Sequence, residues 1–92
     1  MAPEFGEAYS KLGSELGESG VASHSIANEY HQYALKLQPK NADFLNNYGA
    51  FLCQVGRPAE AIEMYRRALQ FNAGHKKAQE NLSQLINKQS TN

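Results

Sequence analysis

A chain of 92 residues is long enough for one small domain, and its 9 basic and 9 acidic side chains balance to a net charge of zero. This balance argues against a broad basic surface for nucleic acid or an acidic membrane. We find no apolar run long enough to span a bilayer and no signal-peptide pattern at the N-terminus. The single cysteine, Cys53, excludes an intrachain disulfide and fits a reducing, cytoplasmic compartment. Few β-branched runs and no strict apolar–polar alternation predict a soluble all-α domain.

The first predicted helix spans about residues 5–18 and places Tyr9, Leu12 and Leu16 on one face. Residues 1–6 are treated as an N-terminal extension, because Glu-Phe is the dipeptide that a common cloning site encodes; a vector origin of residues 1–5 stays open. A turn is predicted over residues 17–23. The second helix follows over about residues 23–38, and Pro39 ends it.

Residues 41–75 predict a helical hairpin. Asn41 can act as the N-cap of its first helix, Gly56 suits the left-handed position at the end of that helix, and Pro58 suits the first turn of the next. Gly49 in mid-helix costs about 1 kcal/mol of helix propensity relative to Ala, so we expect a close helix contact there. The expected contact surface is Ala61 and Ala68, with the Tyr65 side chain filling the adjacent space.

A fifth helix is predicted from His75 to about Asn87, with Ala78, Leu82, Leu85 and Ile86 on one apolar stripe and a polar opposite face. The polar face is typical of a helix that caps a stack of repeats. Residues 88–92 are expected to form a frayed tail.

The first two helices and the second hairpin share a sequence pattern. A shift of thirty-six residues places Gly13 on Gly49 and Gly20 on Gly56, and a shift of thirty-four places His31 on Tyr65. The two shifts differ because the first turn carries two extra residues, which loops tolerate.

The second hairpin resembles the tetratricopeptide repeat, a helix–turn–helix unit of 34 residues. The matching residues are Gly49, Gly56, Ala61, Tyr65 and Ala68. The departures are Leu45, Tyr48, Leu52 and Ala73, where the family favours Trp, Leu, Tyr and Pro. The resemblance implies an all-α, right-handed α-solenoid fragment, with one repeat over residues 7–41, a second over residues 42–75 and a capping helix over residues 76–88; residues 89–92 are the tail.

The resemblance also implies a protein–protein interaction scaffold, because the first helices of stacked hairpins line a concave surface that binds peptides or partner helices. The expected peptide-binding residues are Lys11, Ser14, Asn46, Asn47, Ala50, Gln54, Lys77, Glu80, Asn81 and Gln84. Their amides can pair with a peptide backbone, although the alternative of a plain polar surface stays open.

Catalytic and metal sites are not expected, and no cofactor is expected. A cysteine nucleophile needs a neighbouring histidine held by a carboxylate, which no pattern here supplies for Cys53. His24 and His31 are two turns apart, whereas helical metal-ligand pairs are usually one turn apart. His31 is better explained by packing, because the other repeat has Tyr65 in that place. The sequence also contains one basic cluster, Arg66, Arg67, Lys76 and Lys77. It could contact phosphate or an acidic peptide, although a plain solvated surface is favoured.

Narrower alternatives stay open. Asn47 and Lys77 match the carboxylate clamp of co-chaperone repeats, but Ser10, Ser14 and Asn81 replace its other residues, which disfavours tight binding of a chaperone C-terminus. Residues 46–53 also resemble tetratricopeptide proteins of type IV pilus assembly. Because two repeats are fewer than the usual three, the chain could instead form a homodimer, exchange helices, or be part of a longer array.

Overall fold

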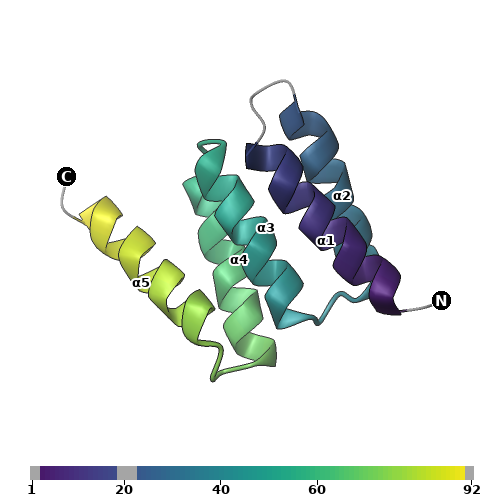
Figure 1. Cartoon of the computed structure of the whole chain (residues 1–92). Helices are drawn as coiled ribbons and strands as arrows, with labels where there is room; N and C mark the ends of the chain where they lie inside the picture. Colours follow the sequence, from purple (N-terminus) through teal and green to yellow (C-terminus); the bar gives the residue numbers. More distant parts are fainter. Residues whose placement is uncertain (1–2, 19–22, 91–92) are drawn as a thin grey trace.

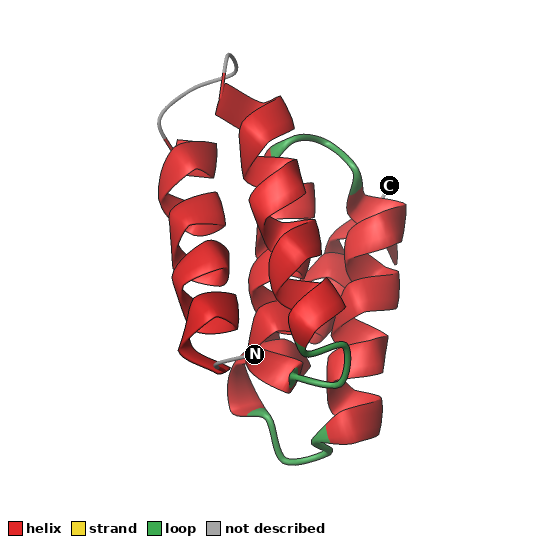
Figure 2. Cartoon of the chain, turned by 90° about the vertical axis from the view of Figure 1, so that its right-hand side faces the viewer, coloured by secondary structure: helices red, strands yellow, loops and turns green. Residues whose placement is uncertain are grey.

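The computed structural model describes residues 3–18 and 23–90, and these residues form five α-helices (Figure 1). The helices are α1 (Pro3–Glu18), α2 (His24–Leu37), α3 (Ala42–Gln54), α4 (Pro58–Phe71) and α5 (Lys76–Ser90). Helices and short loops account for both described ranges, which contain no strand (Figure 2). The prediction of an all-α fold is confirmed. None of the described helices combines the length and the apolar character that crossing a membrane requires.

The helix ends differ from the predicted ends by a few residues. Helix α1 begins at Pro3, inside the segment treated as an extension, and α5 continues to Ser90 rather than ending near Asn87. Gly17 and Glu18, predicted to begin the first turn, belong to α1, and residues 19–22 of that turn lie outside the described residues.

Two helical hairpins lie side by side, and α5 packs at one end of the stack (Figure 1). Helix α1 pairs with α2, and α3 pairs with α4. Helix α3 also contacts both helices of the first hairpin, whereas α5 packs mainly on α4 and touches α3. The helices α1, α3 and α5 therefore follow one another along one side of the molecule.

The second hairpin has the helix ends that its sequence predicts. The Asn41 side chain caps α3, since its Oδ1 accepts a hydrogen bond of 3.0 Å from the Phe44 N–H. Gly56 has φ of +81°, a conformation that penalises a Cβ, and Pro58 is the first residue of α4. These three predictions are confirmed.

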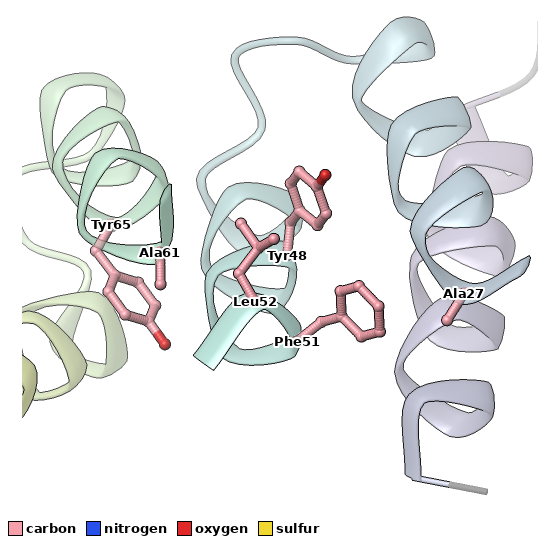
Figure 3. Close-up of a cluster of buried hydrophobic side chains, with 6 residues drawn as sticks. All are labelled: Ala27, Tyr48, Phe51, Leu52, Ala61 and Tyr65. Atoms are coloured by element: carbon pink, nitrogen blue, oxygen red, sulfur yellow. The ribbon is translucent and has the colours of Figure 1, made fainter. Parts of the chain in front are cut away.

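The core extends from α2 past α3 to α4 and consists mainly of small and aromatic side chains (Figure 3). Its buried residues are Ala27, Tyr48, Phe51, Leu52, Ala61 and Tyr65. A second cluster of Leu45, Ala68 and Ala78 joins α3, α4 and α5. Leu82 and Leu85 of α5 pack against the first cluster, whereas Ile86 is 37% exposed. Ile86, the fourth residue of the predicted stripe, lies at its exposed edge, roughly 80° around the helix from Ala78.

Glycines in the helices make room for rings. A Cβ on Gly49 would lie 2.6 Å from Cε1 of Tyr65, and a Cβ on Gly13 would lie 2.8 Å from the His31 ring. The close contact predicted for Gly49 therefore exists, but the ring of Tyr65 makes it rather than Ala61 and Ala68, which are themselves fully buried. The same pairing of glycine and ring occurs in both hairpins.

His31 is a core residue. It is 1% exposed, and its ring stacks on Tyr48 at 5.5 Å and lies 5.2 Å from Phe51. Neither ring nitrogen has a hydrogen-bond partner among the described protein atoms. Burial lowers the pKa of His31 to about 4, because the charged form loses its hydration, so the side chain is neutral at pH 7. The prediction that His31 packs as Tyr65 does is confirmed.

Candidate functional site

A hollow of about 770 Å³ opens between α1, α3 and the start of α5. Polar and charged side chains make up most of its lining, and Phe44 is its large apolar member. The lining residues are Glu7, Ser10, Lys11, Ser14, Gln38, Asn41, Asp43, Phe44, Asn46, Asn47, His75 and Lys77. We call this hollow the groove.

The structure brings together in the groove five of the ten residues predicted to bind peptide: Lys11, Ser14, Asn46, Asn47 and Lys77. The other five lie on the same three helices without lining it: Ala50, Gln54, Glu80, Asn81 and Gln84. The groove thus sits toward the N-terminal ends of α3 and α5, whereas the sequence placed candidates along the whole length of these helices.

Side-chain amides connect the three helices that form the groove. The Asn47 Nδ2 donates to Ser10 Oγ at 2.9 Å, which links α3 to α1. The Asn81 Nδ2 donates to Asn46 Oδ1 at 3.0 Å, which links α5 to α3. Gln54 adds a bond of 2.9 Å from its Nε2 to the Gly17 carbonyl. Because Ser10 and Asn46 are 2% and 6% exposed, these bonds satisfy buried polar groups and fix the helices relative to one another.

His75 lies at one end of the groove, where its hydrogen bonds connect α5 to α3. Its Nδ1 accepts a hydrogen bond of 3.1 Å from the Ala78 N–H and thereby caps α5. Its Nε2 lies 2.7 Å from Asp43 Oδ1, to which it donates, since Nδ1 is used as an acceptor. Asp43 belongs to α3, so the pair joins the starts of α3 and α5.

Sequence reasoning placed His75 at the start of the fifth helix and did not assign it to the groove. A signal was present: Asn41 and His75 are one repeat of thirty-four residues apart, and each accepts a bond from the N–H three residues later. The loop residue Gln38 was also missed. Its Oε1 accepts from Asn41 Nδ2 at 3.0 Å, a contact that no helical periodicity indicates.

The charges of the groove are balanced. Glu7 and Asp43 are acidic, and Lys11 and Lys77 are basic. Asp43 is engaged by His75, whereas the two lysines are exposed and come from different helices, α1 and α5. The groove can therefore offer two separated cations together with amide and hydroxyl groups.

Groups suited to chemical catalysis are not gathered in the described part of the chain. The polar neighbour of Cys53 is Tyr65, with 3.8 Å between Sγ and the hydroxyl oxygen. Burial, with this contact, raises the pKa of Tyr65 above its usual range, so the hydroxyl keeps its proton and does not serve as a base for the thiol. No cluster of three or more His, Cys, Asp or Glu side chains able to hold a metal ion occurs among the described residues.

Comparison with known proteins gives one family. Residues 32–63 match a family model described as Tetratricopeptide repeat, a segment that contains the end of α2, all of α3 and the start of α4. No curated protein matches the chain.

Proposed function

Because residues 32–63 match a tetratricopeptide repeat model, we propose that this chain is a non-catalytic scaffold that binds an extended peptide or partner helix in the groove. Proteins of this repeat class generally mediate protein–protein contacts. Within the proposal, residues 7–41 and 42–75 are the two repeats, and residues 76–88 cap the stack. The lone Cys53 favours a reducing compartment, and we place the scaffold in the cytoplasm.

The observation that carries the proposal is that the Asn47 side chain lines the groove with hydrogen-bonding capacity to spare. Its bond to Ser10 uses one amide proton and fixes the orientation of the side chain. That bond does not use the Oδ1 acceptor or the second N–H of the same amide. A peptide bond needs one acceptor and one donor, so Asn47 can pair with a main-chain amide of a ligand without rearranging.

The two exposed lysines support an acidic ligand. Lys11 and Lys77 stand on α1 and α5, on either side of α3, and can pair with carboxylates of a bound segment. Ser10 and Ser14 are short and uncharged where a carboxylate clamp has longer polar side chains, so we expect moderate rather than tight binding of a C-terminal carboxylate. Phe44 is the large apolar residue of the groove lining.

A displayed library of random peptides, panned against the purified chain, tests this proposal. The selected peptides are then titrated against the wild type and the Asn47→Ala/Lys77→Ala variant. The control variant, Arg66→Ala/Gln70→Ala, also removes one cation and one amide, but from exposed positions of α4. We expect the groove variant to bind at least tenfold more weakly, as losing a charge-assisted bond and an amide pair implies, and the control to bind normally.

Thermal melting of both variants checks that they stay folded. The proposal fails if the selected peptides bind the groove variant as well as the wild type, or if the α4 variant alone loses binding. It also fails if repeated panning enriches no peptide.

A further inference from the structure

The first hairpin carries an apolar face that nothing in the described structure covers. Phe5 and Leu12 of α1 are 54% and 42% exposed, and Ile26 and Tyr33 of α2 are 49% and 51% exposed. This face points away from α3, because the residues of α1 that meet α3 are Gly6 and Gly17 on another side of the helix. Figure 2 is viewed from the α1–α2 side of the molecule.

The residues of this face have the spacing of coiled-coil contacts. On α1 they are Phe5, Tyr9 and Leu12, and on α2 they are Ile26, Tyr30, Tyr33 and Leu37. The intervals of four and three residues on α1, and of four, three and four on α2, keep side chains on one stripe facing a partner helix. At the centre, the Tyr9 ring stacks on Tyr30 at 5.7 Å and lies 5.5 Å from Tyr33. We call these seven residues the outer face.

Two opposite charges flank the outer face on α2. Glu29 and Lys36 are seven residues apart, and with Gln32 and Tyr33 they line a shallow hollow of about 220 Å³. Neither takes part in the Arg57–Glu60 or the His75–Asp43 ion pair. Both side chains are exposed.

Glu29 and Lys36 of one chain can pair with Lys36 and Glu29 of a second copy. When two copies of α2 lie antiparallel, Glu29 of each helix comes near Lys36 of the other, and the two-fold axis produces this pair twice. A parallel arrangement brings like charges to the same level and is disfavoured. The charges flanking the outer face thus select an antiparallel second copy.

The other end of the stack does not offer a matching surface. The outward side of α5 is polar, and its exposed residues include Lys77, Glu80, Ser83, Gln84 and Asn87. An apolar face seated on this polar helix would bury amides and charges without partners. Face-to-face pairing of two outer faces, in contrast, buries aromatic and aliphatic groups against their equivalents.

We propose that the outer face binds a second copy of this chain, in a two-fold dimer in which α2 lies antiparallel to the partner's α2 and α1 antiparallel to the partner's α1. The four exposed hydrophobic side chains then leave water, with the tyrosine group at the centre. The groove lies between other surfaces of α1, α3 and α5, so the dimer leaves it open and does not depend on the proposed peptide binding.

Sedimentation velocity across a wide range of protein concentrations tests the dimer. We expect the wild type to change from monomer to dimer as its concentration rises, and Tyr33→Glu to stay monomeric at every concentration. Tyr33 is half exposed, so this variant should fold, which circular dichroism checks.

Charge reversal tests the antiparallel geometry. Glu29→Lys and Lys36→Glu each place like charges together twice, and each should raise the dimer dissociation constant by about tenfold. The double variant restores both pairs and should dimerise as the wild type does. An equimolar mixture of the two single variants should form a heterodimer more readily than either forms a homodimer. The control, Glu63→Lys on α4, should have no effect.

Several results would overturn the proposal. A wild-type chain that is monomeric throughout shows that the outer face does not bind a second copy. A dimer that survives Tyr33→Glu uses another surface. Growth beyond the dimer indicates head-to-tail association, and a charge-swapped double variant as weak as the single variants contradicts the antiparallel pairing.

Discussion

Acid should destabilise this chain through a single buried side chain, His31. The ring lies in the core against Tyr48 and Phe51, and burial lowers its pKa to about 4. In the unfolded chain the same ring has a pKa of about 6.5. Because the folded-state value is the lower one, the stabilisation is complete above the unfolded value and is lost as the pH falls from about 6.5 towards 4.

The magnitude follows from these two values. At about pH 5, the unfolded chain binds a proton at this site almost completely, whereas the folded chain mostly excludes it, so folding becomes less favourable by about 2 kcal/mol. The full loss at still lower pH is about 3 kcal/mol. Small domains have unfolding free energies of about 5–15 kcal/mol, so this is a measurable fraction of the total.

Urea unfolding at about pH 7.5 and about pH 5, followed by circular dichroism, measures the effect. His31→Phe is the matched variant, because it keeps a planar ring in the core and cannot be protonated. The wild type should lose about 2 kcal/mol more than the variant between the two pH values. Every other ionisable group is present in both proteins, so the comparison isolates the contribution of His31. Equal losses in the two proteins would refute the assignment of a buried, neutral His31.

Three substitutions test the packing and the helix ends by urea unfolding. Gly49→Ala should destabilise the chain by about 1 kcal/mol, because overpacking against Tyr65 exceeds the gain in helix propensity. In a Tyr65→Ala background the same change should stabilise by about 1 kcal/mol, and an unchanged sign would contradict the ring contact. Gly56→Ala should cost about 1 kcal/mol of stability, because φ of Gly56 is positive. The control Gly74→Ala should be nearly neutral, since the nearest atom to an added Cβ lies at 3.7 Å. Equal effects of the two substitutions would count against the left-handed turn at Gly56. Asn41→Ala should cost about 1 kcal/mol and Asn41→Asp much less, since Asp keeps the capping oxygen; equal costs would exclude the cap.

The helices were predictable because each carries its own signals. The cap at Asn41, the glycine at position 56 and the proline at position 58 act within one or two turns, so the local sequence contains them. The correspondence of His31 with Tyr65 predicted a buried ring, because the two hairpins repeat the same packing.

The groove was only partly predictable, because part of its lining depends on a loop and on contacts between distant residues. Gln38 enters it from the loop after α2, and the Asn47–Ser10 bond joins residues thirty-seven positions apart.

The measurement that tests the central claim most directly is an amide chemical-shift titration of the ¹⁵N-labelled chain with a peptide selected by panning. If the groove binds the peptide, the shifts should concentrate in the residues of α1, α3 and the start of α5 that line it, with Asn46, Asn47 and Lys77 among them. Shifts confined to the exposed surfaces of α2 and α4 would contradict the proposed scaffold function.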